Sequence, residues 1–378
     1  MVDVPLTQDA AGILLLEDGT EFTGRIASHT SCTGELVFTT NMSGYQEVLT
    51  DPSFAGQIVV MTSPMIGNYG VNASDVQSDR PWVAGFVVRE LRESSDGWRA
   101  EASLPDYLRT HGIPVLHGVD TRAVTRHIRS LGAMRALIAR ADIDRGDARA
   151  RLESEPEMLG RDLASVVSTS VPYVLEARGE TIGEVVCLDL GVKRSSLNLL
   201  SAEGFRVRVM PGKSSLSEVM AAKPAGLFVS NGPGDPEAVH GVGSVIREVA
   251  AAGIPVFGIC LGCQLVARAF GGQTYKLPYG HRGGNHPVRR LDSGAVEITS
   301  QNHGFAVVED DGVVVGAPDL EITHRNLNDG TVEGLRHRNL PVFAVQYHPE
   351  AAPGPHDSRY LFDQFIELMS ATRAVPTG

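Results

Sequence analysis

Between residues 183 and 271, short apolar runs alternate with segments of helical periodicity, and this alternation limits the possible folds more than any other feature. Four apolar runs predict buried strands, at residues 184–190, 205–210, 226–230 and 255–259. The predicted helices that follow them lie at residues 193–202, 215–222, 238–252 and 261–270. Such alternation predicts an α/β fold with a mostly parallel sheet, helices on both faces and right-handed crossovers. Functional sites in these sheets lie just beyond the carboxyl ends of strands, where Asn231 and Cys260 are found.

The first part of the chain is different, because it is rich in turns and strand-like runs. The runs lie at residues 12–16, 21–27, 35–38, 57–61 and 82–89, with Asp18-Gly19 as a hairpin turn. Helical patterns follow at residues 103–110 and 121–129, and the charged segment 140–157 is typical of a solvated helix. We therefore predict a strand-rich, mixed α/β domain at residues 1–170, a linker at 171–182 and a second domain at 183–378.

Composition excludes several classes of function. The chain has 378 residues, of which 42% are hydrophobic, and a formal net charge of −12, so each domain can bury a core. Binding to nucleic acid or to an anionic membrane needs concentrated Lys and Arg, which an acidic chain does not favour. The aliphatic run at residues 13–16 is too short for a signal-peptide core or a membrane span. Four cysteines in a chain of this length fit a reducing compartment, and we expect a soluble cytoplasmic protein.

Cys260 lies between Gly258 and Gly262, at the boundary between a predicted strand and a predicted helix. Gly-x-Cys-x-Gly at such a boundary has the form of a nucleophile elbow, whose glycines allow a tight turn that exposes the central side chain. The helix N-terminus stabilises a thiolate, and the backbone N–H after the nucleophile is placed to bind an oxyanion. The alternatives are a buried structural cysteine, or a redox Cys-x-x-Cys with Cys263, which leaves the two glycines unexplained.

A thiol nucleophile for acyl transfer needs a base, and the base needs a group that orients it. The predicted strand at residues 341–347 ends in His348-Pro349-Glu350. Residues i and i+2 of an extended chain project to the same side, and Pro349 keeps this segment extended. His348 and Glu350 can therefore touch, which leaves the second ring nitrogen free to accept the proton of Cys260. The alternative is an ordinary surface pair.

Three further polar segments contain glycine and are interpreted as loops, at residues 231–236, 280–286 and 301–305. The first follows a predicted strand, so its small residues would let backbone N–H groups approach a substrate, although an ordinary surface turn is the alternative. The histidines considered as metal ligands are His281, His286, His303 and His348. Their spacings match no compact metal motif, and we predict no metal site.

Taken together, the residues from Gly183 to near the C-terminus resemble the class I, or triad, glutamine amidotransferases. The resemblance implies a glutaminase that forms a γ-glutamyl thioester on Cys260, with His348 as the base and Glu350 orienting it. It also implies an oxyanion site made by the backbone at Gly232 and Leu261. The residues that it implies for holding glutamine are Gly234, Gln264, Asn302, Gly304 and Phe305.

Nearly the whole chain resembles the family of carbamoyl phosphate synthetase small subunits. The segments that carry this resemblance are LEDGT at 16–20, NMSGYQEVLTDPSF at 41–54, SPMIGNYG at 63–70, GVDTR at 118–122, GVKR at 191–194 and the HPEAAPGPH tail at 348–356. The resemblance implies that Ser53 reaches across to the glutamine site, whereas Asp51-Pro52-Ser53 alone predicts a plain turn. The chain departs from many members of the family at Cys263, where they have His.

This second resemblance also implies a partner. Ammonia would pass through an internal tunnel to a large synthetase subunit, which uses ATP, Mg and bicarbonate to make carbamoyl phosphate for arginine and pyrimidine biosynthesis. This chain has no Gly-x-x-x-x-Gly-Lys-Ser/Thr loop, so we expect no cofactor in it and a heterodimer or higher oligomer with the large subunit. The alternatives are an amidotransferase subunit for GMP, anthranilate or CTP synthesis, and a non-catalytic scaffold that regulates a partner.

Overall fold

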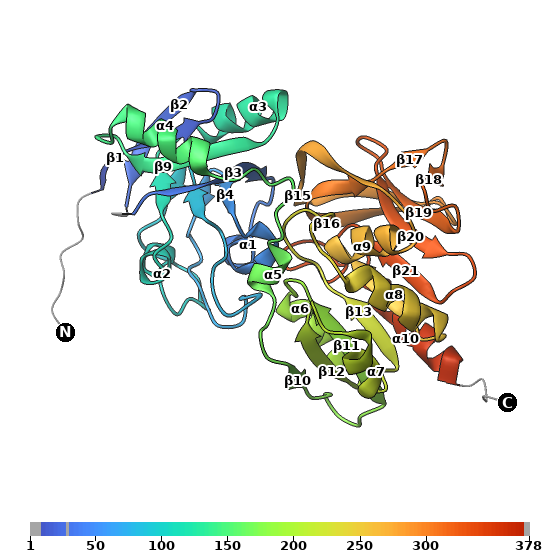
Figure 1. Ribbon diagram of the computed structural model, residues 1–378. Coiled ribbons are helices and arrows are strands. Elements are labelled where there is room, and N and C mark those ends of the chain that lie inside the picture. The colour runs from blue at the N-terminus through green and yellow to red at the C-terminus, as the bar shows by residue number, and fades with distance from the viewer. Residues whose placement is uncertain (1–8, 28–29, 374–378) are drawn as a thin grey trace. The chain divides into compact units, whose positions relative to one another are not determined.

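The computed structural model describes residues 9–27 and 30–373 and divides the chain into two compact units (Figure 1). The first unit is Met1–Met158 with Pro278–Arg282, and the second is Leu159–Leu277 with Gly283–Gly378. The division falls ahead of the linker expected at residues 171–182. That segment includes β10 (Tyr173–Leu175), which pairs antiparallel with β12 (Phe205–Pro211), so this part of it is a strand of the second unit.

The first unit is built on a closed barrel that mixes parallel and antiparallel pairs. Its strands, in order around the barrel, are β1 (Ala10–Leu16), β2 (Glu21–Ile26), β8 (Val115–His117), β6 (Gly85–Val87), β4 (Gln57–Met61), β3 (Cys32–Thr39) and β9 (Met134–Arg140). The other elements are α1 (Tyr45–Thr50), η1 (Pro52–Phe54), β5 (Met65–Ile66), β7 (Glu90–Leu91), α2 (Leu104–Thr110), α3 (Thr121–Leu131) and α4 (Arg145–Ser154). Successive residues of β1 alternate between two cores, with Leu14 in one and Ile13 and Leu15 in the other, against Leu152 of α4.

Two of the expected elements in this unit are shorter than the sequence patterns indicate. The strand-like run at residues 82–89 forms only the three-residue strand β6. The charged segment expected as a helix at 140–157 begins with the last residue of β9, and α4 starts at Arg145. Asp144 sets that start, because its side chain accepts hydrogen bonds from the backbone N–H groups of Gly146 and Asp147 at 2.8 and 3.0 Å.

The second unit contains the parallel sheet that the alternating pattern predicts. In the order of the sheet its strands are β10, β12, β11 (Gly183–Asp189), β13 (Gly226–Val229), β14 (Val256–Ile259), β21 (Val342–Val345), β20 (Val332–His337), β19 (Leu320–Asn326), β15 (Thr274–Arg290) and β16 (Val296–Val307). The strands from β12 to β21 are parallel, and β20 and β19 extend the sheet in antiparallel pairs. The predicted fold is therefore confirmed, with an antiparallel extension that the sequence pattern did not indicate.

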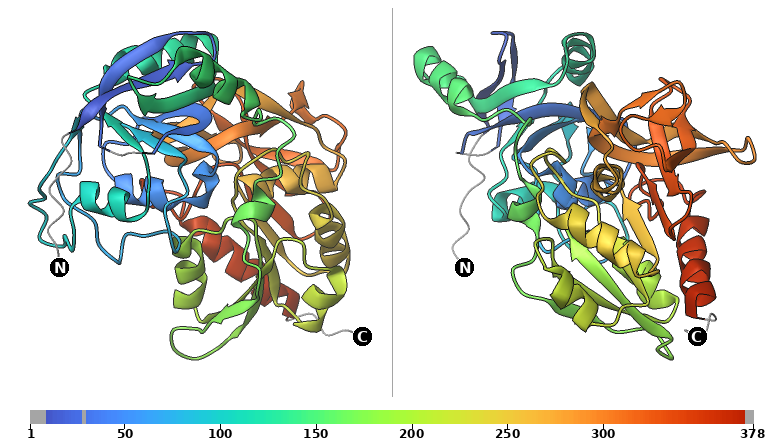
Figure 2. Two further views of the ribbon diagram at one scale, coloured as in Figure 1. Left: turned by 60° about the vertical axis from the view of Figure 1, so that its left-hand side comes forward. Right: turned by 45° about the vertical axis from the view of Figure 1, so that its right-hand side comes forward.

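Helices cover both faces of this sheet (Figure 2). The helices of the second unit are α5 (Ala164–Val167), α6 (Arg194–Ala202), α7 (Leu216–Ala221), α8 (Val242–Ala251), α9 (Leu261–Ala269) and α10 (Tyr360–Arg373), and β17 (Glu309–Asp310) and β18 (Val313–Val314) form a small hairpin. Leu227 and Val229 of β13 pack in one core with α8 and α9. Phe228 between them packs in the other core, with α6 and α10, as the alternation of a strand requires. Among the described residues, no helix combines the length and apolar character needed to cross a membrane.

Two segments interpreted as loops are strands, and that interpretation was wrong. Residues 280–286 lie within β15, and residues 301–305 lie within β16. Their glycines and polar side chains are typical of turns, but here the polar side chains are buried. Gln301, for example, is 2% exposed and makes its hydrogen bonds inside the protein. Buried polar groups are normally satisfied in this way, so polarity alone did not distinguish these strands from loops.

Candidate active site

Cys260 occupies a tight turn between β14 and α9, as the Gly-x-Cys-x-Gly pattern predicts. Its backbone has φ 55° and ψ −106°, a conformation that non-glycine residues rarely adopt. A Cβ atom on Gly258 would lie 2.7 Å from the carbonyl oxygen of Gly262, and one on Gly262 would lie 2.1 Å from that of Val229. Both glycines are therefore required by close backbone contacts, and Cys260 is held at the N-terminal end of α9.

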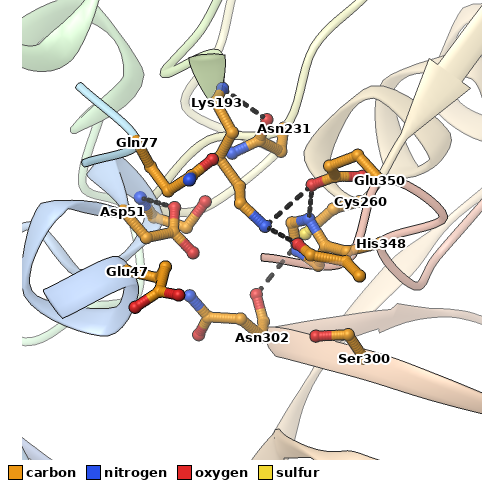
Figure 3. A network of polar contacts seen from close by, with 12 residues as sticks. Glu47, Asp51, Gln77, Lys193, Asn231, Cys260, Ser300, Asn302, His348 and Glu350 are labelled. Atoms are coloured by element: carbon orange, nitrogen blue, oxygen red, sulfur yellow. Dashed lines mark hydrogen bonds and ion pairs between the residues drawn. The ribbon is translucent and has the colours of Figure 1, made fainter. Parts of the chain in front are cut away.

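His348 and Glu350 follow β21, the parallel neighbour of β14, so they reach the same edge of the sheet as Cys260 (Figure 3). The Nδ1 atom of His348 lies 2.7 Å from Oε1 of Glu350, and both side chains are almost fully buried. Within the described part of the chain, His348 Nε2 has no hydrogen-bond partner. The Cys260 thiol lies near the ring, and its Sγ is 3.5 Å from the carbonyl oxygen of Asn302. Nδ1 is thus committed to the carboxylate, and Nε2 is available for proton transfer.

The electrostatics of these residues favour a charged His348. Burial alone would lower the pKa of His348, but the Glu350 carboxylate beside it outweighs burial and raises that pKa above its usual range, with a smaller contribution from Cys260. Burial alone would raise the pKa of Glu350, but Lys193 and His348 together hold it below its usual range. An imidazolium next to a cysteine sulfur favours the thiolate, which is the attacking form.

Lys193 is a residue of this site that sequence reasoning did not identify. It follows β11, is 2% exposed, and places Nζ 2.9 Å from Oε1 of Glu350, with a further hydrogen bond donated to the carbonyl oxygen of Ala351. Its backbone N–H donates to Oδ1 of Asn231 at 3.3 Å, and Asn231 donates to the carbonyl oxygen of Gly191 at 2.8 Å. The available signal was a basic residue in a loop at the carboxyl edge of the sheet, where sites are expected.

Gly232, predicted for the oxyanion site, and Gly234, predicted for glutamine binding, lie in a loop that tolerates no added side chain at either position. A Cβ atom on Gly232 would lie 2.0 Å from the carbonyl oxygen of Leu190 and 2.9 Å from the side chain of Leu261. Gly234 has φ +91°, and a Cβ atom there would lie 2.5 Å from the carbonyl oxygen of Arg161. Leu261 is the first residue of α9, where backbone N–H groups have no partner within the helix. The arrangement therefore offers backbone donors next to the nucleophile.

Among the residues expected to hold glutamine within the second unit, Gln264 and Asn302 contact Cys260. Gln264 lies on the first turns of α9, and its Nε2 donates to the carbonyl oxygen of Phe305 at 2.9 Å and to Oε1 of Gln346 at 3.2 Å. Asn302, Gly304 and Phe305 lie on β16, and the carbonyl of Asn302 contacts the nucleophile. The structure thus brings α9 and β16 together at Cys260.

Ser53 belongs to the first unit. It lies in η1, is 6% exposed, and its backbone N–H donates to Oδ1 of Asp51 at 2.9 Å. The turn predicted from Asp51-Pro52-Ser53 is therefore present as one turn of 3-10 helix. The expected approach of Ser53 to the glutamine site stays a prediction.

Comparison with known proteins gives consistent matches along the chain. Residues 14–138 match the family described as carbamoyl-phosphate synthase small chain, CPSase domain, and residues 186–368 match glutamine amidotransferase class-I. The chain is 48% identical over 374 residues to the carbamoyl phosphate synthase small chain of Syntrophotalea carbinolica. The aligned region covers 96% of this chain and 98% of that relative. The small chains of Synechococcus sp. (47% over 385 residues; 99% and 97% covered) and Chlorobaculum tepidum (48% over 365 residues; 96% and 98% covered) are similarly close.

Proposed function

The chain belongs to the carbamoyl phosphate synthase small-chain family and is a glutamine amidotransferase, and from this premise we propose how it releases ammonia. The Cys260 thiolate attacks the side-chain carbonyl carbon of L-glutamine and forms a tetrahedral intermediate. The His348 imidazolium donates its Nε2 proton to the amide nitrogen, which leaves as ammonia, and a γ-glutamyl thioester remains. Neutral His348 then takes a proton from water, which hydrolyses the thioester to glutamate and restores Cys260.

The arrangement of Cys260, His348 and Glu350 is the observation that carries this proposal. The 2.7 Å contact between His348 Nδ1 and Glu350 fixes which ring nitrogen faces the thiol. The backbone N–H groups of Gly232 and Leu261 stabilise the oxyanion in this mechanism, and the close contacts around Gly232 support that role. The residues proposed to bind glutamine are Ser53, Gly234, Gln264, Asn302, Gly304 and Phe305.

The ammonia is consumed by a partner chain in this proposal. Membership of a small-chain family supports a large synthetase chain as that partner, in a heterodimer or a higher oligomer. The partner binds ATP and Mg and makes carbamoyl phosphate from ammonia and bicarbonate, for arginine and pyrimidine biosynthesis in the cytoplasm. This chain supplies no cofactor or metal of its own in that scheme.

The test uses the small chain assembled with its large chain. The wild-type complex should make carbamoyl phosphate from either glutamine or free ammonia, whereas the complex with Cys260→Ser should use only ammonia. Cys263→Ala is the matched control, because Cys263 is a buried thiol on the same helix and should leave both activities in place. Equal glutamine-dependent rates for wild type and Cys260→Ser would exclude the nucleophile and favour the scaffold alternative. A small chain that assembles with a GMP, anthranilate or CTP synthetase instead would exclude the proposed partner.

A further inference from the structure

A closed ring of buried hydrogen bonds lies next to the nucleophile, and four of its six residues have no role in the proposed mechanism. It joins side chains or backbone groups of Gln264, Gln301, His303, Phe305, Glu333 and Gln346, none of which is more than 5% exposed. The carbonyl oxygen of Phe305 lies 2.7 Å from the His303 ring and accepts from the Gln264 side chain at 2.9 Å, and Gln264 also donates to the Gln346 side chain at 3.2 Å. The backbone N–H of Gln346 donates to the carbonyl oxygen of Glu333 at 2.9 Å. The Glu333 carboxylate accepts from the Gln301 side chain at 3.0 Å, and the Gln301 amide oxygen closes the ring 2.9 Å from His303. The ring therefore connects α9, β16, β20 and the residue that follows β21.

The orientation of the Gln301 amide follows from its neighbours. Its Nε2 faces Oε2 of Glu333 at 3.0 Å and Oγ1 of Thr299 at 3.1 Å. The Thr299 hydroxyl donates its own hydrogen to the carbonyl of His286 at 2.9 Å, so it accepts from Gln301. If the amide were turned around, its oxygen would face the Glu333 carboxylate and the Thr299 hydroxyl, and neither would have a hydrogen to donate to it. Gln301 must therefore present Oε1 to His303.

This orientation determines the protonation of His303. The Nδ1 atom faces the carbonyl oxygen of Phe305 at 2.7 Å, and a carbonyl oxygen only accepts. The Nε2 atom faces Oε1 of Gln301 at 2.9 Å, which also only accepts. Both ring nitrogens therefore carry hydrogens, and His303 is an imidazolium although only 5% of it is exposed.

A buried cation needs a compensating anion, and Glu333 is in place to supply it. A ring nitrogen of His303 and a carboxylate oxygen of Glu333 lie within 4.8 Å of each other. Oε2 of Glu333 accepts from Gln301, and Oε1 accepts from Nδ2 of Asn326 at 2.7 Å, so hydrogen bonds hold both carboxylate oxygens. Gln301 bridges the two charges.

We propose that Glu333 is a positioning residue for glutamine hydrolysis, which acts through Gln301 on the imidazolium of His303. Asn302 lies between Gln301 and His303, and its carbonyl oxygen is 3.5 Å from Cys260 Sγ. Phe305 and Gln264, which also belong to the proposed glutamine site, are members of the same ring. Fixing His303 therefore fixes the edge of β16 against which glutamine binds. This inference rests on the proposed function of the site.

Glu333→Gln tests the proposal because it keeps the shape of the side chain and removes the charge. The Glu333 carboxylate accepts hydrogen bonds from the side-chain amides of Gln301 and Asn326, so an amide at this position turns one of its own donors against one of theirs. We expect the KM for glutamine to rise at least tenfold while kcat changes by less than about threefold, the pattern of lost substrate binding. Glu333→Asp keeps the charge, and its KM for glutamine should lie between those of wild type and Glu333→Gln. Glu184→Gln removes a carboxylate that pairs with Arg206 and Arg208 elsewhere in the unit and should leave KM unchanged.

Nitrogen NMR of histidine-labelled protein reports the protonation of the His303 ring nitrogens directly in the wild-type protein. The signals of His303, identified by their loss in His303→Asn, should show two protonated ring nitrogens in the wild-type protein. An unprotonated nitrogen on His303, whether neutral or bound to a metal ion, would overturn the proposal. So would an unchanged KM in folded Glu333→Gln while wild type hydrolyses glutamine. Absence of glutamine hydrolysis in the wild-type complex itself would instead refute the proposed function.

Discussion

Lys193 Nζ lies 2.9 Å from Glu350 Oε1, the same carboxylate oxygen that lies 2.7 Å from His348 Nδ1. One oxygen thus accepts from a cation on each side, inside a site where all three side chains are buried. A buried carboxylate is stable only when it is paired, so Lys193 and His348 together keep Glu350 ionised. Lys193 comes from the loop after β11, and it connects that strand to the end of β21.

Lys193→Met should impair catalysis through Glu350 rather than through substrate contact. Without the ammonium group the pKa of Glu350 rises, because Lys193 is one of the groups that hold it low. The carboxylate then orients the His348 ring less firmly. We expect kcat for glutamine to fall by about 10- to 100-fold, and stability to fall by about 3 kcal/mol, as for one broken buried ion pair. Steady-state kinetics and urea unfolding measure these effects. An unchanged kcat would show that His348 alone is enough to hold Glu350.

Gly232→Ala should disturb the proposed oxyanion site directly. The added Cβ atom would lie 2.0 Å from the carbonyl oxygen of Leu190, so the backbone at residue 232 must move. Loss of one oxyanion donor commonly lowers kcat by about 10²- to 10³-fold, and we expect a decrease of that size. Gly243→Ala on α8 is the control, since its nearest neighbour would be 3.5 Å away and a helical Gly→Ala change stabilises by about 1 kcal/mol. Equal activity of the two variants would remove Gly232 from the site.

Much of the second unit could be predicted because its signals are local. Each strand and helix from β11 to α9 begins and ends within a few residues of the segment that the apolar pattern indicates. The antiparallel extension was missed for a physical reason. In β15 and β16 the side chains that face the interior are often polar and bonded to one another, so the apolar alternation that identifies a strand is absent. Closure of the barrel in the first unit depends on pairs such as β1 with β9, which are far apart in sequence.

The site divides in the same way between local motifs and long-range contacts. Cys260 with its glycines and the pair His348 and Glu350 are short motifs, and the structure brings them to adjacent parallel strands. Lys193 and Glu350 are far apart in the sequence, and no local pattern indicates that they form an ion pair. Glu333 lies outside every motif found in the sequence. The structure places it on β20 with its side chain buried.

The four cysteines should differ sharply in reactivity. Burial raises the pKa of Cys187 and Cys263 well above the usual range, and burial raises the pKa of Cys32 to about 12. These three are thiols at neutral pH and should react slowly, whereas Cys260 lies beside an imidazolium at a helix N-terminus. Brief treatment with iodoacetamide at pH 7, followed by peptide mass spectrometry, should find the label on Cys260. Prior incubation with glutamine should slow the labelling. Label on Cys263 at a comparable rate would show that α9 opens more readily than its burial implies.

His324 should make the second unit sensitive to mild acid. It lies on β19, 7% exposed, with Nε2 3.2 Å from the hydroxyl of Tyr360 and Nδ1 2.8 Å from that of Thr323. Burial lowers the pKa of His324 to about 4, and Arg290 nearby contributes in the same direction. Below the ordinary histidine pKa of about 6.5 the unfolded chain binds a proton that the folded chain does not. The buried neutral His324 therefore costs no folding stability above about pH 6.5, and the protein loses stability as the pH falls from there towards 4.

His324→Gln removes this dependence while keeping a polar side chain near Tyr360. The variant should be less stable than wild type at pH 7, because it loses the packing of the imidazole against the Tyr347 ring, whose centroid is 5.7 Å away. As pH falls from 7 to about 4, wild type should lose up to about 3 kcal/mol that the variant does not lose, so the two stabilities converge. Urea unfolding midpoints measured at several pH values follow this difference. A constant gap between the two proteins across that range would mean that His324 is protonated in the folded state, and that the interior around β19 admits water.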